Sequence, residues 1–375
     1  MESVVVTPRW NTATGQRPAS VIERDLHAIA SELEPALRPL RGETLLVTGG
    51  AGFVCSYFVD TIAFLNTQAW ERSCQVVCLD NLVTGRLPRL AHLLDRPDVH
   101  IIQHDLSKPL RALPKAVRGR LWVIHGAGIA SPITYRRHPL ETIAVNVQGT
   151  QHVLELAKAR QARSVLYLSS SEVYGDPPAE WIPTPEEYRG HVSCTGPRAC
   201  YDESKRLAET LCLTYHRQFG LPVNIARPFN VYGPGQRLDD GRVMPDLIAA
   251  AVHRQPLVLY SDGRATRAFC YITDAIRAMW WVVMAGRHGE AFNVGNDQEE
   301  LPMQELAQRV RRAAGPPELP IEQRRSQDAE YLTDNPQRRC PNLQKLRAAF
   351  PWTPAVPLSE GLQRTLEASR DMTDG

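Results

Sequence analysis

A tyrosine and a lysine stand four residues apart in the segment Tyr201-Asp202-Glu203-Ser204-Lys205. On a helix, this spacing places the phenol and the ammonium on one face. The ammonium charge favours phenolate over phenol, so we expect it to lower the pKa of Tyr201 from about 10 toward neutral pH. Such a group can remove a hydroxyl proton as a general base. The pair also occurs by chance in many helices, so it indicates redox chemistry only beside a dinucleotide site.

A glycine-rich turn provides that second signal at residues 47–56, which read V-T-G-G-A-G-F-V-C-S. An apolar run precedes the turn, and Phe53 and Val54 begin a stretch of helical period, which predicts a strand, a turn and a helix. Gly49 suits the tight turn, and Gly52 allows the backbone to approach a pyrophosphate at the N-terminus of the helix.

A second apolar strand at residues 75–79 ends at Asp80 and Asn81. A carboxylate at this position can accept both ribose hydroxyls of a bound adenosine and repels a 2′-phosphate. The sequence therefore favours NAD over NADP, although Arg86 is close enough to soften that preference.

A serine-rich segment, Ser169-Ser170-Ser171-Glu172, follows the apolar run at residues 165–168. Parallel α/β sheets bind their ligands at the carboxyl ends of the strands. A hydroxyl in this segment can share the reacting proton with Tyr201.

The bulk composition excludes several classes of protein. The 375 residues include 43 Lys plus Arg and 41 Asp plus Glu, and this balance gives no electrostatic reason to expect nucleic acid or a membrane as a partner. No apolar run reaches about eighteen residues and no signal-peptide core is seen, so we expect a soluble, cytoplasmic protein. The eight cysteines include no C-x-x-C pair and the histidines show no ligand spacing, so we expect neither disulfides nor a metal.

Apolar strands and helices alternate from residue 43 to about 227, which predicts an α/β fold with a doubly wound parallel sheet. Residues 1–41 form an N-terminal extension with an amphipathic helix. We expect a dinucleotide-binding domain at 42–227 plus about 268–296, where residues 291–295 read as a strand that rejoins the sheet. A smaller, interwoven substrate lobe is expected at about 228–267 plus 297–375.

Taken together, these motifs resemble the extended short-chain dehydrogenase/reductase family, over about residues 43–370. The matching pieces include Thr48-Gly49-Gly50-Ala51-Gly52, Asp80-Asn81, His104-Asp105-Leu106, Gly126-Ala127, Ser169 to Gly175, Tyr201 to Lys205, 227–234 and Arg267-Ala268-Phe269. The resemblance implies a Rossmann-type fold, NAD as cofactor and a nucleotide-linked sugar as substrate. It also implies further cofactor contacts, at Phe53, Val54, Asn81, Asp105, Leu106, Gly126, Ala127, Tyr201 and Lys205. The family has glycine where Cys55 stands, which puts the packing of that helix in doubt.

Within this family, the chain is most similar to UDP-glucuronate decarboxylases. That similarity implies an oxidation triad of Ser170, Tyr201 and Lys205, with Glu172 near C5 of the sugar and Arg267 for the charged groups of the substrate. Further substrate-binding residues are then expected to be Ser131, Tyr135, Asn230 and Arg242. Oxidation at C4 places a ketone β to the C6 carboxylate, so CO2 leaves, C5 gains a proton, and the cofactor returns its hydride.

Several alternatives stay open at this point. A 4,6-dehydratase needs an Asp–Glu pair, and Ser171 stands at the Asp position; a serine is a poor general acid. A 4-epimerase needs only the triad. A sensor or scaffold without catalysis is disfavoured by the presence of Tyr201 and Lys205, and a reductase that consumes NADPH is disfavoured by Asp80. We expect a homodimer joined through the helix after Lys205.

Overall fold

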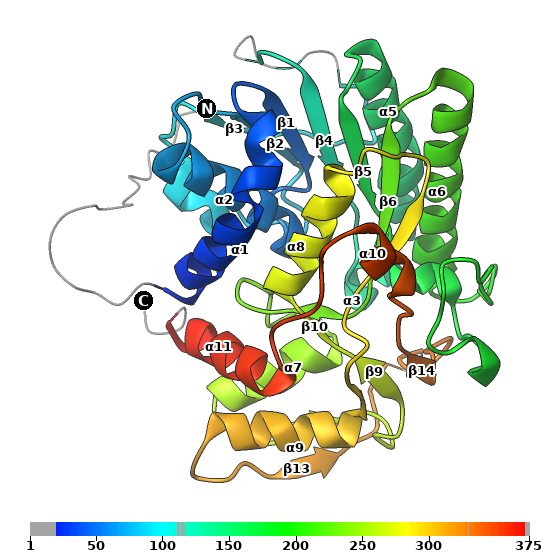
Figure 1. Cartoon of the computed structure of the whole chain (residues 1–375). Coiled ribbons are helices and arrows are strands. Elements are labelled where there is room, and N and C mark those ends of the chain that lie inside the picture. The colour runs from blue at the N-terminus through cyan, green and yellow to red at the C-terminus, as the bar shows by residue number, and fades with distance from the viewer. Residues whose placement is uncertain (1–19, 111–112, 114–116, 329, 372–375) are drawn as a thin grey trace, which may run out of the picture.

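The computed structural model describes residues 20–371, except 111–112, 114–116 and 329. In this part of the chain, a seven-stranded parallel sheet has the order β11-β6-β5-β4-β1-β2-β3 (Figure 1). Its strands are β1 Thr44–Thr48, β2 Gln75–Asp80, β3 Val99–Gln103, β4 Leu121–His125, β5 Ser164–Leu168, β6 Val223–Pro228 and β11 Ala291–Val294. The predicted doubly wound sheet is confirmed, and the strand expected to rejoin it pairs in parallel with β6.

The strands are apolar because both faces of the sheet are covered. Along β1, successive side chains alternate between two cores, with Leu45 and Val47 in one and Leu46 in the other. Helices α2 Phe53–Gln68 and α8 Ile272–Val283 cover the first face. Helices α5 Thr150–Ala159 and α6 Ala199–Phe219 cover the second.

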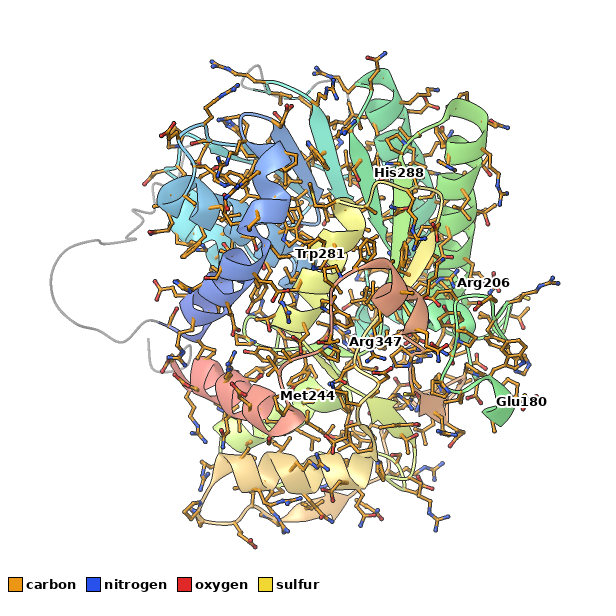
Figure 2. All side chains as sticks on the ribbon, viewed as in Figure 1. Glu180, Arg206, Met244, Trp281, His288 and Arg347 are labelled. Carbon is orange, nitrogen blue, oxygen red and sulfur yellow. The ribbon has the colours of Figure 1, made fainter. Side chains whose placement is uncertain are left out.

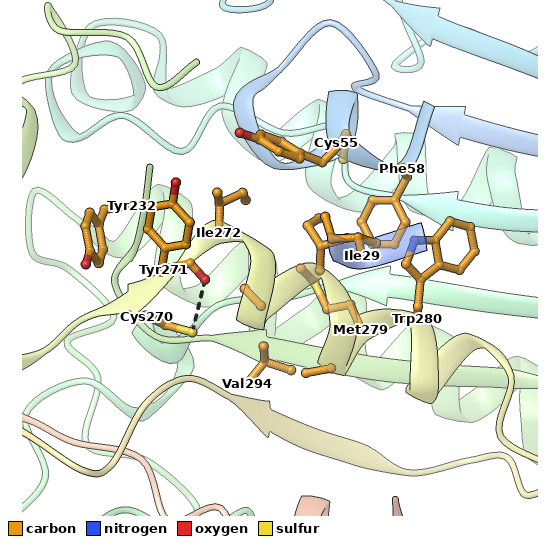
Figure 3. Packing of buried hydrophobic residues seen from close by; sticks show 14 of the residues in the cluster. Ile29, Cys55, Phe58, Tyr232, Cys270, Tyr271, Ile272, Met279, Trp280 and Val294 are labelled. Atoms are coloured by element: carbon orange, nitrogen blue, oxygen red, sulfur yellow. Dashed lines mark hydrogen bonds between the residues drawn. The ribbon is translucent and has the colours of Figure 1, made fainter. Parts of the chain in front are cut away.

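The first core contains an aromatic contact between the two helices that cover this face of the sheet. Phe58 of α2 meets Trp280 of α8 edge to face, with ring centroids 4.9 Å apart, and Ile29 packs beside them (Figure 3). Trp281, the next residue, lies on the α10 side of the same helix and stacks on Phe350 (Figure 2). This packing fixes α2, whose N-terminus borders the glycine-rich turn.

The smaller lobe lies below the sheet in Figure 1. Its helices are α7 Val243–Val252, α9 Met303–Ala314 and α11 Leu358–Asp371, and α10 Gln344–Ala349 lies nearer the sheet. Its short strands are β8 Leu257–Leu259 with β13 Ile321–Gln323, and β9 Thr266–Ala268 between β12 Glu300–Pro302 and β14 Arg338–Arg339. Strands β7 Val231–Tyr232 and β10 Cys270–Tyr271 connect the lobe to the sheet.

Short helices complete the described chain. They are η1 Arg38–Leu40, η2 Leu87–Leu93, α3 Pro132–Arg137, α4 Pro139–Ala144, the π-helical turn η3 Val145–Gly149, η4 Ser171–Tyr174 and η5 Ala179–Trp181. Among the described helices, none has the length and apolar character that crossing a bilayer requires.

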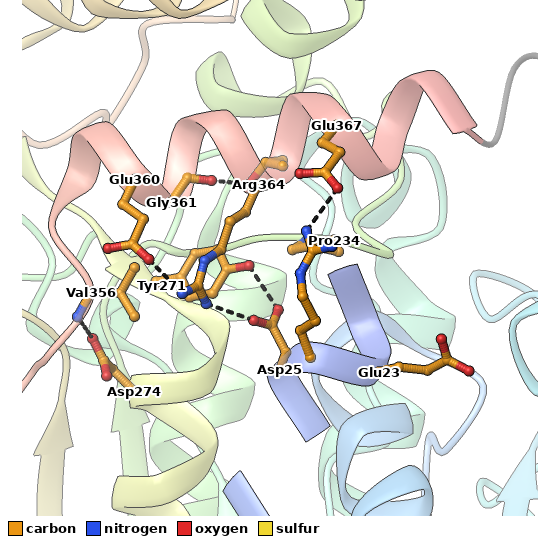
Figure 4. A network of polar contacts seen from close by, with 12 residues as sticks. Glu23, Asp25, Pro234, Tyr271, Asp274, Val356, Glu360, Gly361, Arg364 and Glu367 are labelled. Atoms are coloured by element: carbon orange, nitrogen blue, oxygen red, sulfur yellow. Dashed lines mark hydrogen bonds and ion pairs between the residues drawn. The ribbon is translucent and has the colours of Figure 1, made fainter. Parts of the chain in front are cut away.

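The helix predicted near the N-terminus is present as α1 Val21–Leu37, which begins with a capping box between Ser20 and Glu23. Its buried Asp25 accepts hydrogen bonds from the Tyr271 hydroxyl at 2.7 Å and from the Arg364 guanidinium at 2.9 Å (Figure 4). Burial raises the pKa of Asp25 to about 6. This carboxyl group therefore links α1 to β10 and α11.

Replacement of Asp25 tests this link. We expect Asp25→Ala to lower the free energy of unfolding by about 2 kcal/mol, because it leaves the Tyr271 hydroxyl and the Arg364 guanidinium without their acceptor. Denaturant unfolding measures the change. Glu367→Ala is the matched control, since it breaks the exposed Arg24–Glu367 pair between the same two helices and should cost less than about 0.5 kcal/mol. Equal losses in the two variants would contradict a special role for Asp25.

Candidate active site

The edge at which the parallel strands end carries the candidate site. The chain order reverses there between β1 and β4, and open α/β sheets bind ligands in the crevice at such a point. The turns after these strands touch, because a Cβ added to Gly49 would lie 2.9 Å from the backbone of Ala127. Gly49 also has a φ of +71°, so both space and conformation require glycine here.

The N-terminus of α2 borders this turn and has no side-chain cap. Among the described residues, a Cβ added to the N-cap Gly52 would meet only the Gly49 carbonyl oxygen within 4 Å. Free backbone N–H groups beside open space fit a pyrophosphate. Asp80 accepts hydrogen bonds from the Ala51 and Leu82 N–H groups at 3.0 and 2.8 Å. Its carboxylate keeps acceptor sites for ribose hydroxyls, so these residues fit a dinucleotide.

Cys55 is accommodated by a neighbouring glycine. A Cβ added to Gly126, just after β4, would lie 2.3 Å from the Cys55 sulfur. The thiol therefore fills the volume that a side chain at residue 126 would need. Close packing of α2 on the sheet is retained, with the glycine just after β4 instead of on the helix.

The other predicted cofactor residues lie at the same strand ends. Phe53 and Val54 are half-buried in the first turn of α2, and Asn81 directly follows β2. Asp105 and Leu106 follow β3, where Leu106 is buried against Gly149 of the π-helical turn. Their contacts with a cofactor stay predictions.

Tyr201, Lys205 and Ser170 come together at the end of β5. Tyr201 and Lys205 are buried on α6, and the Lys205 ammonium donates to the Leu168 carbonyl at 2.8 Å. This ammonium lies 5.9 Å from the centroid of the Tyr201 ring. Ser170 directly precedes η4 and forms a side-chain hydrogen bond with Tyr201. The fold thus gathers the three residues assigned to proton removal.

The prediction that the Lys205 charge lowers the pKa of Tyr201 is wrong for the protein without a bound ligand. Burial raises the pKa of Tyr201 to about 12, which outweighs the hydrogen bond from Ser170 and the charge of Arg242. Burial also lowers the pKa of Lys205 to about 8, and its hydrogen bond goes to Leu168. A phenolate at neutral pH therefore needs further positive charge from a bound ligand.

A half-buried carboxylate between two arginines lies next to this triad. Glu172 of η4 forms ion pairs with Arg198, which precedes α6, and with Arg339 of β14. We call these three residues the Glu172 clamp. Burial raises the pKa of Glu172, but the two guanidinium charges prevail and hold it well below its usual range. At neutral pH, Glu172 is a carboxylate and can accept a proton or stabilise positive charge.

Arg267 lies beside the clamp and is held by neutral acceptors. Its guanidinium donates to the carbonyls of Thr266 and Pro336 at 2.8 and 2.7 Å and to the Asn335 side chain at 3.1 Å. Within the described residues, it forms no ion pair. Burial and the charge of Arg339 lower its pKa to about 10, so it stays protonated. An uncompensated buried cation suits a negatively charged ligand.

A pocket between the sheet edge and the smaller lobe is lined by all members of the clamp and by Arg267. Asn230 and Arg242 also line it. Asn230 has a φ of +40°, which is uncommon outside glycine, and its side-chain amide donates to the Ala268 carbonyl at 3.0 Å. Other lining residues include Tyr260, Tyr331 and, at the start of α7, Met244 (Figure 2).

The two remaining residues predicted to bind substrate, Tyr135 and Ser131, differ in their position relative to the pocket. Tyr135 lines the pocket and stacks on Tyr201 with ring centroids 5.1 Å apart. Ser131 is absent from the pocket lining among the described residues, and its hydroxyl donates to the Asp240 carbonyl at 2.9 Å. Ser171, the residue at the dehydratase Asp position, is buried in η4.

The sequence patterns predict no functional role for Arg198, Arg339 or Asn146. Arg339 is 167 positions from Glu172, so no local spacing could reveal the pair. Asn146 lies in the π-helical turn, donates to the Ser204 hydroxyl at 2.8 Å and has a buried Oδ1 without a partner among the described residues. Such turns are frequent at functional sites.

Residues 45–295 match the model of the NAD dependent epimerase/dehydratase family. The chain is 39% identical over 330 residues to UDP-glucuronic acid decarboxylase 1 of Arabidopsis thaliana, covering 87% of this chain and 70% of that protein. It is similar to the solved structure of an epimerase from Methanothermobacter thermautotrophicus, with 26% identity, a TM-score of 0.78 and coverage of 92% and 97% of the two chains. It is also similar to dTDP-glucose 4,6-dehydratase from Streptomyces venezuelae with NAD and TYD bound, with 26% identity, a TM-score of 0.73 and coverage of 88% and 97%.

Proposed function

The chain belongs to the NAD dependent epimerase/dehydratase family, and from this premise we propose that it is an NAD-dependent decarboxylase that converts UDP-glucuronate to UDP-xylose. The observation that carries this proposal is the Glu172 clamp beside Arg267. A pocket with the buried guanidinium groups of Arg267 and Arg339 and the half-buried one of Arg198 suits a sugar that bears a carboxylate. The decarboxylase relative is also more similar in sequence than the epimerase and the dehydratase.

The glycine-rich turn after β1 and Asp80 would hold NAD, which would supply the hydride acceptor for oxidation at C4 of the sugar. Tyr201 removes the C4 hydroxyl proton, and Ser170 shares that proton through its hydrogen bond with the phenol. Lys205 holds its ammonium beneath the Tyr201 ring through the Leu168 carbonyl. Burial disfavours the Tyr201 phenolate, and the positive charge of a bound nicotinamide would favour it.

The 4-keto sugar then loses its C6 carboxylate as CO2, and the electron pair of the broken bond forms an enolate. Arg267 holds the carboxylate before it leaves, and Tyr201 and Ser170 donate hydrogen bonds to the C4 oxygen of the enolate. C5 of the enolate then takes up a proton that comes from solvent, beside the Glu172 clamp. The 4-keto group is reduced in the last step, so the cycle consumes no net cofactor.

The rival outcomes are less well supported. Ser171 cannot replace the aspartic acid of a dehydratase pair, because its hydroxyl ionises far above neutral pH. Epimerisation at C4 requires only the triad, so it does not explain the Glu172 clamp and the Arg267 guanidinium near C6. The protein should be incubated with NAD and UDP-glucuronate, and the product should be analysed by mass spectrometry. We expect a mass lower by one CO2; a product of unchanged mass would favour epimerisation, and loss of water would favour dehydration.

We also propose that the chain forms a homodimer through α4 and α6. Leu140 and Ile143 of α4 and Leu207 and Phe219 of α6 are exposed apolar side chains on two helices that pack together. Such clusters mark protein interfaces.

Introducing a charge tests this interface. We expect Leu207→Glu to convert the dimer to monomer, since a carboxylate at a packed seam loses its hydration. Sedimentation velocity measures the result. Trp181→Glu is the control, because Trp181 is comparably exposed in η5, away from these helices. A wild-type protein that sediments as a monomer would refute the proposal.

A further inference from the structure

Asp202, next to the proposed base on α6, is a buried acid with poor partners. Its side chain is almost inaccessible, and its Oδ2 lies 3.8 Å from Arg198 Nε, too far for a hydrogen bond. Among the described residues, neither Asp202 Oδ1 nor Arg198 Nε has a hydrogen-bond partner. Glu172, by contrast, pairs closely with both arginines of the clamp. Asp202 therefore interacts more weakly than Glu172 with the Arg198 guanidinium.

Charged groups from several elements face Asp202. Glu172 of η4 disfavours its ionisation, while Arg198 before α6 and Arg339 of β14 favour it. Asp334, from the loop before β14, adds a second negative charge. Among the described residues, no hydrogen bond to the carboxylate offsets its desolvation, so the neutral acid is the form that suits this site.

We propose that Asp202 is a charge-tuning residue: in its neutral form it leaves the guanidinium groups of Arg198, Arg339 and Arg267 available to an anionic sugar, and its ionisation weakens binding of that sugar. The inference rests on the proposed function only in assigning a sugar carboxylate to this pocket. Three guanidinium groups and the Glu172 carboxylate carry two net positive charges. Ionised Asp202 halves that charge and draws Arg198 away from Glu172.

Burial, reinforced by the charge of Glu172, raises the pKa of Asp202 to about 8. The neutral form therefore prevails below that pH, and the affinity for an anion is lost as the pH rises through about 8. Lys205 loses its proton over the same range, so the turnover rate cannot isolate Asp202. Equilibrium binding is the appropriate measurement. Lys205 lies beside Tyr201, where C4 of the sugar would bind, and UDP-glucuronate and UDP-glucose are identical at C4. A charge change at Lys205 should therefore affect the Kd of both ligands alike.

The experiment uses titration calorimetry on the NAD-loaded protein with UDP-glucuronate and, as the neutral counterpart, UDP-glucose. For the wild type, we expect the Kd of UDP-glucuronate to rise about tenfold from about pH 7 to about pH 9, while that of UDP-glucose stays nearly constant. In Asp202→Asn, which keeps the shape without the charge, the Kd of UDP-glucuronate should lose this rise. Glu203→Gln is the matched control, since Glu203 is the neighbouring acid on α6 and pairs with Arg206 at the surface; it should behave as the wild type.

An equal rise for both ligands in the wild type would overturn the inference, and this comparison needs no variant. Persistence of the rise in a folded Asp202→Asn protein would overturn it as well. Failure of the proposed function is a separate result. Tight, pH-dependent binding of UDP-glucuronate without release of CO2 would remove the reaction and leave the role of Asp202 in place.

Discussion

Replacing Tyr201 with phenylalanine is expected to reduce turnover of UDP-glucuronate by about 10³-fold, the usual contribution of a positioned general base. The Tyr201 phenol on α6 forms a hydrogen bond with Ser170, and the Lys205 ammonium lies 5.9 Å from the centroid of its ring. Phenylalanine keeps the ring that stacks on Tyr135, so the fold and substrate binding should be retained. Initial rates, titration of the substrate and circular dichroism separate these effects.

Tyr135→Phe is the matched control for this experiment. The Tyr135 hydroxyl is buried and has no partner among the described residues, although the two rings are neighbours. Its removal should change the turnover rate by less than about tenfold, the scale of one neutral hydrogen bond. A Tyr201→Phe protein with wild-type turnover would refute the assigned base.

The second large effect is expected from Glu172→Gln. An amide cannot balance the two guanidinium charges of Arg198 and Arg339, so we expect a loss of about 3 kcal/mol in the free energy of unfolding. Release of CO2 should fall by about 10²-fold or more, because the clamp faces C5 and the departing carboxylate. The first oxidation at C4 depends on Tyr201 and should be less affected. Rapid-mixing absorbance of NADH and trapping of CO2 measure the two steps.

Glu155→Gln serves as the control, because Glu155 lies at the surface and pairs with Lys158. This change should leave both steps and the stability nearly unchanged. Equal losses of oxidation and decarboxylation in Glu172→Gln would contradict a specific role of Glu172 at C5. Equal losses with every candidate sugar would do the same.

Local sequence patterns predicted the parts of the site that lie within one segment. The alternation of apolar strands and helices predicted the parallel sheet, and the glycine-rich turn and the Tyr201–Lys205 spacing placed two parts of the site at its edge. The sheet is confirmed, and both motifs lie at its edge, because such patterns depend on backbone geometry over a few residues. The strand that rejoins the sheet at β11 was also predicted, from its apolar pattern alone.

Contacts between distant segments could not be predicted in this way. Arg339 reaches Glu172 from a two-residue strand of the smaller lobe, and only the fold brings them together. The Tyr201 pKa was misjudged because spacing reveals the lysine charge but not the burial that outweighs it. The packing of Cys55 on α2 depends on Gly126, which follows β4 about seventy positions later in the chain. Each of these features is set by packing, which a single sequence does not display.

The most direct test of the account is the reaction of UDP-glucuronate with the NAD-loaded protein in D2O, followed by NMR and mass spectrometry of the product. We predict release of CO2 and a UDP-pentose that carries solvent deuterium at C5 and its original hydrogen at C4, with no net change in NAD. Deuterium at C4 would contradict the return of the same hydride. Retention of the C6 carboxylate in the product would contradict decarboxylation itself.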